Sequence, residues 1–262
     1  MRHFAAALWV EMLKARRSRV PLITGLGFLI APIMGGFFMI ILKDPERARQ
    51  MGLISTKAQL TVGTADWPAF LSLLAQATAV GGAMLFAIIA IWIFGREFSD
   101  RTVKEILALP TPRSAIVTAK FVVSAAWCLA ITILMLILGM LIGGLVNIPG
   151  WSAALARSAV QDILLTSLLT ITLLPYAALF ASAGRGYLPA FGWTILTIVL
   201  AQVAALTGWG DWFPWSIPAL FSGAAGPRAD LLGIHSYVII TLASLLGLFL
   251  TFRWWRDADQ TR

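Results

Sequence analysis

The chain has little charge, one cysteine and two histidines, and each shortage excludes a class of protein. Charged residues make up 12% of its 262 residues, against about 25% in typical soluble domains, and 59% are hydrophobic. This amount of polar surface is too small to cover a water-soluble globule. The sequence therefore predicts an integral membrane protein. Cys128 alone cannot form an intrachain disulfide. With only His3 and His235 to offer imidazole ligands, we expect no metal site.

Catalytic motifs are missing as well. None of the five lysines follows a glycine, so the Gly-Lys-Ser/Thr loop that cradles nucleotide phosphates cannot form. The sequence has no Gly-x-Ser-x-Gly nucleophile motif and no pair of carboxylates within its apolar runs. We therefore expect this chain not to be an enzyme and to bind no cofactor. If ATP drives it, another polypeptide must hydrolyse the ATP.

Six apolar runs are long enough to cross a hydrocarbon core, which needs about 20 helical residues. We expect a single all-α domain, 1–262, in which Pro32 bends the first span and Pro175 the fourth. Gly139 and Gly143 in the third span form a Gly-x-x-x-Gly motif, which fits either dimerisation or packing within the chain. The expected spans are residues 22–42, 69–94, 121–146, 160–183, 188–206 and 234–252.

The N-terminal segment, residues 1–20, is too polar to span a membrane. Phe4, Leu8 and Met12 form an apolar stripe at helical spacing, and Trp9 can anchor it at headgroup depth. The pattern predicts an amphipathic helix lying in the membrane interface. The basic residues that follow it can also act simply as a stop on translocation.

A second charged segment, residues 95–120, separates the second and third spans. Ser99 or Asp100 can cap a helix there, and an apolar face made by Val103, Ile106 and Leu107 follows. We expect a short amphipathic helix at the membrane surface, with the basic residues of the segment in water. A loop of this kind can also serve only to orient the protein.

The residues of this segment resemble the loop between the second and third spans of type-2 ABC exporter permeases. The shared pattern is Arg96-Glu97, then Asp100-Arg101-Thr102, then Glu105-Ile106-Leu107-Ala108-Leu109-Pro110, with Arg113 after the proline and Lys120 opening the next span. In that family the segment is a coupling helix that docks on the ATP-hydrolysing subunit, and an amphipathic elbow helix before the first span touches it too. The resemblance implies ATPase contacts from the elbow helix at Glu11, Lys14 and Arg17. It implies coupling-helix contacts at Glu97, Phe98, Asp100, Arg101, Thr102, Val103, Lys104, Glu105, Ile106, Leu107 and Arg113.

The resemblance also implies partners. Two permease subunits, identical or different, would surround a central path, and separate ABC ATPase subunits would hold ATP and Mg. The Trp-rich segment Trp209–Trp215 matches in position the short re-entrant helices between spans five and six, on the extracytoplasmic side. The layout is similar to small permeases that expel peptide antibiotics such as bacitracin or lantibiotics. The scarcity of polar groups in the spans favours amphipathic or lipophilic cargo, with drugs and lipids left open, and no substrate-binding residues can be named.

Charge distribution predicts the orientation. Most of the 20 Lys and Arg lie in the N-terminal segment, the 95–120 segment and the C-terminal tail, so we expect both termini on the cytoplasmic side of a bacterial plasma membrane. The net charge of +8 then faces anionic lipid, not nucleic acid. Asp162 is expected at the outer interface, in water or paired with Arg157. A different class stays open: an ATPase-independent carrier or membrane scaffold, because Pro32 and Pro175 occupy similar places in the two halves.

Overall fold

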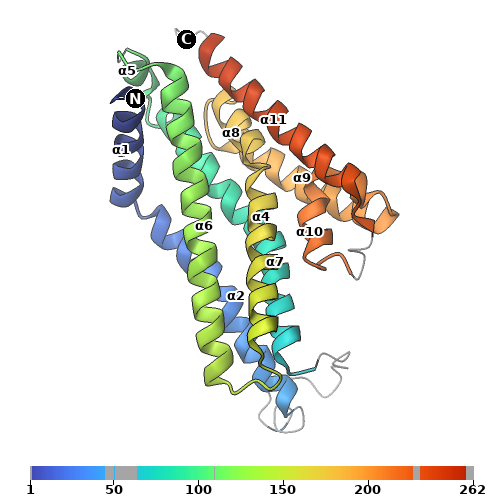
Figure 1. Ribbon diagram of the computed structural model, residues 1–262. Coiled ribbons are helices and arrows are strands. Elements are labelled where there is room, and N and C mark those ends of the chain that lie inside the picture. Colours follow the sequence, from blue (N-terminus) through green and yellow to red (C-terminus); the bar gives the residue numbers. More distant parts are fainter. Residues whose placement is uncertain (1, 45–49, 51–63, 109, 227–230, 258–262) are drawn as a thin grey trace.

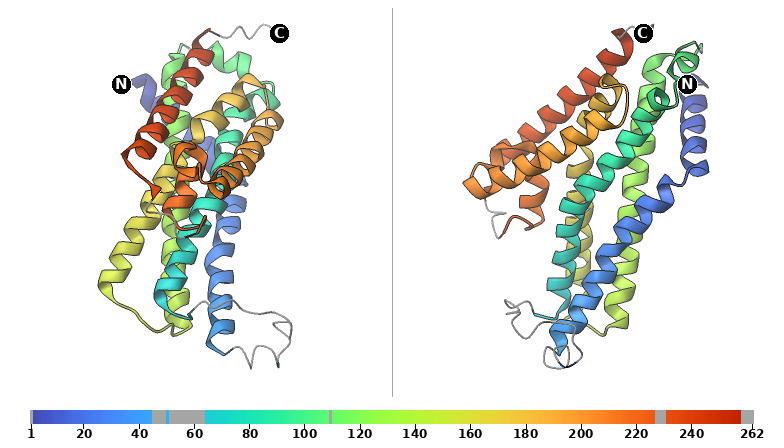
Figure 2. Two further views of the ribbon diagram at one scale, coloured as in Figure 1. Left: turned by 90° about the vertical axis from the view of Figure 1, so that its right-hand side faces the viewer. Right: turned by 180° about the vertical axis from the view of Figure 1, so that it is seen from behind.

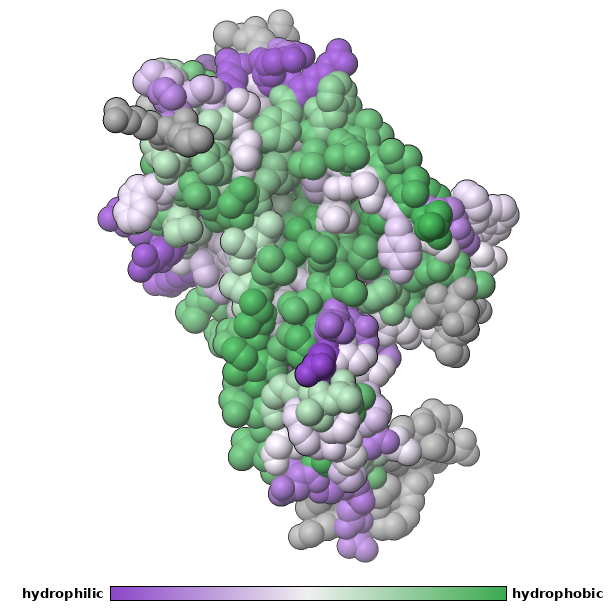
Figure 3. Space-filling model, viewed as in Figure 1, coloured by the Kyte–Doolittle hydropathy of each residue, from purple (hydrophilic) through white to green (hydrophobic). Residues whose placement is uncertain are grey.

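The computed structural model describes residues 2–44, 50, 64–108, 110–226 and 231–257, and their regular structure is entirely helical. Six helical segments are long and apolar enough to cross a membrane: Val20–Lys43, Trp67–Ser99, Arg113–Leu145, Ala153–Ala183, Leu188–Thr207 and Ile234–Asp257. The predicted all-helical fold with six membrane-crossing segments is thereby confirmed. Figure 3 shows the matching surface, a broad hydrophobic middle between hydrophilic ends.

Figure 1 shows how the elements follow one another. In chain order they are α1 (Arg2–Arg17), α2 (Val20–Lys43), α4 (Trp67–Ser99), α5 (Val103–Leu107), α6 (Arg113–Leu145), α7 (Ala153–Ile171), α8 (Leu174–Ala183), α9 (Leu188–Thr207), the 3-10 turns η1 (Gly210–Trp212) and η2 (Pro214–Ser216), α10 (Ile217–Phe221) and α11 (Ile234–Asp257).

Local sequence explains where several helices begin and end. The Asp66 side chain accepts a 2.8 Å hydrogen bond from the Ala69 amide and so caps α4. The fourth crossing is interrupted: α7 ends at Ile171, four residues before Pro175, and α8 begins at Leu174. Proline lacks an amide hydrogen, and its ring clashes with the carbonyl four residues earlier, so the break falls where the ring requires it.

The central element is α4, which packs against α2, α6, α7, α8 and α9. Its side chains Phe70, Leu74 and Phe86 are fully buried. On α6, a methyl group added to Gly139 would meet the Leu74 side chain, and one added to Gly143 would overlap the Trp67 ring. The two glycines therefore let α6 approach α4 closely, and packing within the chain explains the Gly-x-x-x-Gly motif.

Two features of the arrangement matter for function. Both ends of the chain and α5 lie at the same end of the molecule (Figure 1). Helices α9 and α11 lean together away from the long helices, and the η1–η2–α10 segment joins them about halfway along the bundle (Figure 2). His235 at the start of α11 is 2.9 Å from Asp211 of η1, which ties the two elements together.

Two helices are longer than expected. α4 continues to Ser99 instead of ending near Phe94, and α6 begins at Arg113 instead of Phe121. Glu97 and Lys120 therefore lie within long helices. Asp162 is exposed, as expected, and no ion pair with Arg157 is present among the described side chains. Most of the polar segment after α2, and Leu109, lie outside the described residues.

Candidate functional site

The end of the bundle that carries both termini brings together elements far apart in sequence. α1 packs along α6, and α4 packs against α6 near the point where α5 connects them (Figure 1). Each of the three long elements turns charged side chains inward: Glu11 and Lys14 from α1, Glu97 from α4 and Lys120 from α6.

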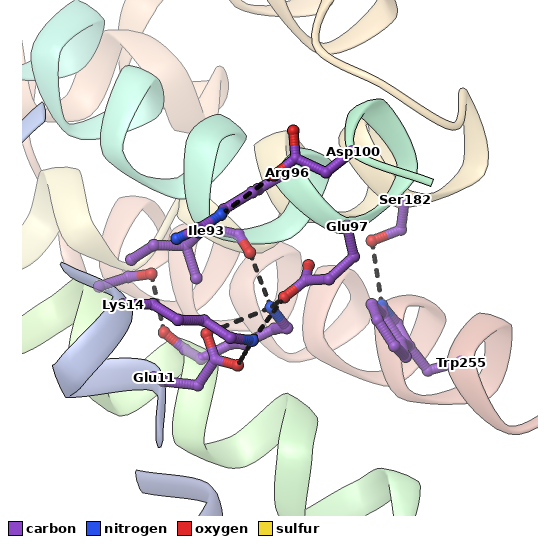
Figure 4. A network of polar contacts seen from close by, with 10 residues as sticks. Glu11, Lys14, Ile93, Arg96, Glu97, Asp100, Ser182 and Trp255 are labelled. Carbon is purple, nitrogen blue, oxygen red and sulfur yellow. Dashed lines mark hydrogen bonds and ion pairs between the residues drawn. The ribbon is translucent and has the colours of Figure 1, made fainter. Parts of the chain in front are cut away.

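These four side chains form a closed network of ion pairs, called here the charge cluster (Figure 4). Lys120 Nζ lies 2.6 Å from Glu97 Oε1 and 3.3 Å from Glu11 Oε2. Lys14 Nζ lies 2.7 Å from Glu11 Oε1 and 3.0 Å from Glu97 Oε1. Each lysine thus contacts both glutamates, and the formal charges cancel.

The cluster is buried, and among the described side chains its Glu97 Oε2 has no hydrogen-bond partner. Lys120 is 0% exposed and Glu97 is 2% exposed. Removing such ions from water costs several kcal/mol each, which only good pairing and saturated hydrogen bonding offset. Lys120 donates a third bond, 2.8 Å, to the Ile93 carbonyl, which uses all three ammonium hydrogens. The Phe94 and Trp255 rings lie 5.7 and 6.0 Å from the same nitrogen, a further favourable contact.

Trp255 extends the cluster toward the C-terminal helices. Its indole Nε1 donates a 3.0 Å hydrogen bond to Ser182 Oγ on α8 (Figure 4). Phe98 of α4 packs edge-on against the same indole, with ring centroids 5.9 Å apart. Four crossings therefore meet around the charges, through α4, α6, α8 and α11.

Lys14 occupies the rim of the cluster, with its side chain 23% exposed. Partial burial lowers the pKa of Lys14, but the negative charges of Glu97 and Glu11, and the hydrogen bonds to them, outweigh burial and raise that pKa above its ordinary value of 10.5. Lys14 is therefore fully charged at neutral pH, and α1 is attached to α4 by an ionic contact under physiological conditions.

Outside the cluster, α5 is amphipathic. Val103, Ile106 and Leu107 are half-buried, whereas Lys104 and Glu105 are exposed. Leu107 packs against the main hydrophobic core, which fixes the orientation of the helix.

The turn from α4 into α5 is tight. Arg101 is exposed and has a positive φ of 59°, a left-handed conformation that costs a non-glycine residue about 1–2 kcal/mol. The Thr102 amide donates a 2.9 Å hydrogen bond to the Glu97 carbonyl across this turn. The backbone that positions α5 is therefore hydrogen-bonded to the residue whose side chain sits in the charge cluster.

Arg113 opens α6 and contacts the other end of the chain. Its Nη1 donates to the Trp255 carbonyl at 3.2 Å and to the Arg256 carbonyl at 3.0 Å. A cation at a helix C-terminus satisfies carbonyls left unpaired there and complements the helix dipole. Arg113 therefore fastens the C-terminal turn of α11 to the start of α6.

The structure corrects three expectations. The resemblance implies a partner contact for Glu97 and Glu11, but both carboxylates are buried and face Lys120 and Lys14. Lys120 was expected in water, and it is fully buried because two carboxylates and a carbonyl replace its hydration. Of the remaining assigned residues, Asp100, Arg101, Lys104, Glu105 and Arg17 are exposed, and Phe98, Thr102, Val103, Ile106, Leu107, Lys14 and Arg113 are partly buried.

Sequence reasoning missed the structural role of Lys120, together with Trp255 and Ser182. A signal for Lys120 was present: it stands between the apolar pairs Ile116-Val117 and Phe121-Val122. A lysine with apolar neighbours on every side of a helix is buried, and a buried lysine requires a carboxylate nearby. No comparable signal marks Ser182, because its partner lies 73 residues away.

Comparisons with known proteins agree with this architecture. A family model described as ABC-2 family transporter protein matches residues 7–202, well over half of the chain, and the match includes the charge cluster and α5. The chain is also 23% identical, over 179 residues, to the protein named bacitracin transport permease protein BCRB of Bacillus licheniformis, with 68% of this chain and 85% of that protein covered. The chain is therefore a multi-pass membrane protein that belongs to the ABC-2 family of transporters, as their membrane subunit.

Proposed function

We propose that this chain is the permease subunit of an ATP-driven exporter and that α5 is its docking helix for a separate ATPase subunit. The exposed Arg101, Lys104 and Glu105 would make the polar contacts, with Arg17 of α1 adding a contact from the neighbouring helix. ATP and Mg would be held by the partner, since this sequence lacks the phosphate-binding loop. Both chain ends would then face the cytoplasm.

The observation that carries the proposal is the position of the charge cluster directly behind α5. A short surface helix alone transmits little, because five residues make barely more than one turn. Here its N-terminal turn is hydrogen-bonded to Glu97, whose carboxylate contacts α1 through Lys14 and α6 through Lys120. A force on α5 would therefore move α1, α4 and α6 together.

The cluster suits this task because of its energetics. Partial separation of the four charges would leave an unpaired ion in an apolar environment, at a cost of about 3–5 kcal/mol. The three helices consequently favour movement as one body over sliding past one another. Two global arrangements of the bundle, inward- and outward-facing, could then be exchanged by closure of the ATPase subunits.

A second permease subunit is part of the proposal. A cavity among α4, α8 and α9, lined by Ala83, Trp193 and Thr197 among others, encloses about 40 Å³. That is room for about two or three water molecules and far too little for a peptide. A path for amphipathic or lipophilic cargo is thus expected between two subunits.

A peptide antibiotic is the first cargo to test, given the name of the BCRB relative.

The test is co-purification of the ATPase with tagged permease in mild detergent. R101N/E105Q removes one charge of each sign from the α5 region, and Asn tolerates the left-handed conformation at position 101. We expect this variant to insert normally and to retain less than a tenth of the ATPase. R157Q/D162N removes the same two charges from exposed positions on α7 and should retain all of it. Equal recovery with both variants would refute docking through α5 and favour an ATPase-independent carrier.

A further inference from the structure

A groove between the start of α6 and the end of α11 has no part in the coupling argument. It encloses about 560 Å³ and is lined by Arg113, Ser114, Phe249, Phe252, Arg253 and Arg256. Three of these six residues are arginines and two are phenylalanines. Such a composition is suited to a ligand that is anionic at one end and apolar at the other.

The arginines keep capacity for a ligand. Arg113 uses one nitrogen for the two carbonyls of α11, and guanidinium groups carry five N–H donors. Arg253 and Arg256 are 63% and 76% exposed. Both contact Asp257, at 3.7 and 2.6 Å, so one carboxylate is shared between two guanidinium groups. The groove therefore keeps a net positive charge.

The outer face of α11 continues this groove as an apolar stripe. Leu242, Leu246 and Phe249 are 60%, 52% and 58% exposed, and Arg253 and Arg256 follow at helical spacing on the same face. Figure 3 shows hydrophilic residues gathered at the end of the molecule where α11 finishes, above a hydrophobic surface. In a membrane that face contacts acyl chains, and its arginines reach headgroup level.

We propose that this groove binds an anionic phospholipid, with the phosphate held by Arg113, Arg253 and Arg256 and the acyl chains lying along Phe249 and the stripe below it. Basic pockets between spanning helices suit acidic headgroups, and guanidinium groups match phosphate geometry. A soluble phosphate would gain nothing from the apolar stripe, which is why a lipid is the occupant. The inference rests on membrane insertion alone and not on the ATPase or the cargo.

The lipid would act on a sensitive position. Arg113 is the first residue of α6 and follows the segment that carries α5, so a phosphate bound there would hold α6 to α11. Occupancy should therefore stabilise the junction that Arg113 already makes with the Trp255 and Arg256 carbonyls.

The experiment uses purified permease without ATPase and counts bound dioleoylphosphatidylglycerol by native mass spectrometry as that lipid is titrated, with dioleoylphosphatidylcholine as the neutral reference. R253Q/R256Q should weaken phosphatidylglycerol binding about thirtyfold, since each arginine near an anionic surface contributes about a fivefold gain. R157Q removes a positive charge from an exposed position on α7 outside the groove and should leave binding unchanged. D257N keeps both arginines, removes the competing carboxylate and should strengthen binding, so it also tests the site should R253Q/R256Q fold poorly.

Two results would overturn the assignment. The first is equal phosphatidylglycerol binding by wild type and R253Q/R256Q. The second is displacement of the lipid by glycerol 3-phosphate at equal concentration, which would mean that only a soluble anion is recognised.

Discussion

The two sides of the molecule are held together by different kinds of contact. Around α4 and α6, buried charges pair in a closed network. In the most apolar stretch of α4, 56% of the residues are buried. For α9 and α11 the corresponding share is 22%. Contacts there include stacked rings, with Trp193 4.3 Å from Phe180 and 5.9 Å from Tyr176. The C-terminal turn of α11 is still hydrogen-bonded to α6 and α8, so the softer contacts are those around α9 and the earlier turns of α11.

The difference suggests a division of labour. Elements that separate only at the cost of exposing an unpaired buried ion behave as one body. Elements with few buried contacts belong to the less stable part of a structure, from which moving parts are drawn. We therefore expect α1, α4, α5 and α6 to form a rigid unit, and α9 with the first half of α11 to be the part that shifts relative to it.

The largest effect should come from breaking the charge cluster. K120M leaves Glu11 and Glu97 sharing only Lys14, so one buried carboxylate loses its counter-charge. We expect the free energy of unfolding to fall by about 3–5 kcal/mol, measured by thermal and denaturant unfolding in detergent.

The matched variant E97Q/K120M removes one charge of each sign and keeps the Glu11–Lys14 pair. It should lose much less stability than the sum of the two single variants, because those variants each strand an ion. Strictly additive losses would mean that the four charges do not act as a unit. The rigidity argued for this region would then lack its cause.

A second prediction compares glycines in the two regions. G143A places a methyl group against the Trp67 ring, and overpacking of this kind costs about 1–3 kcal/mol. Gly192 in α9 has nothing within 4 Å of an added methyl group, so G192A should be neutral or stabilise the helix by about 0.5–1 kcal/mol. Thermal unfolding of the two variants measures the contrast. Similar losses would indicate that α9 is packed as tightly as α6.

The sequence predicts features set by neighbouring residues and misses those that depend on residues far apart in the chain. The length of the apolar runs was enough to find the six crossings, and Pro175 marked the break between α7 and α8. The ends of α4 and α6 were misplaced because Glu97 and Lys120 looked like residues that need water. Their burial depends on Glu11, which is 109 residues from Lys120. The apolar neighbours of Lys120 indicate its burial, but no local pattern identifies Glu11 as its partner, so the cluster required the fold.

The smallest effect concerns pH. The pKa of Lys14 is raised above 10.5 in the folded protein by Glu97 and Glu11. Its contribution to stability is therefore complete below pH 10.5 and is lost as the pH rises through the folded-state pKa. The difference in free energy of unfolding between wild type and K14M should stay constant near neutral pH and shrink in strongly alkaline solution. A difference that already shrinks near neutral pH would mean that Lys14 is not held by the two carboxylates.

The most direct test of the central claim measures distances within the working complex. Paired spin labels would be placed on a C128A background, which removes the single cysteine, and read by double electron–electron resonance with and without trapped ATP. One pair joins exposed Met12 on α1 to exposed Ala108 at the end of α5, and the other joins Met12 to Leu206 on α9, which is 78% exposed. None of these three residues belongs to the proposed ATPase contact. We expect an unchanged 12–108 distance and a shifted 12–206 distance. A shifted 12–108 distance with an unchanged 12–206 distance would contradict the rigid unit.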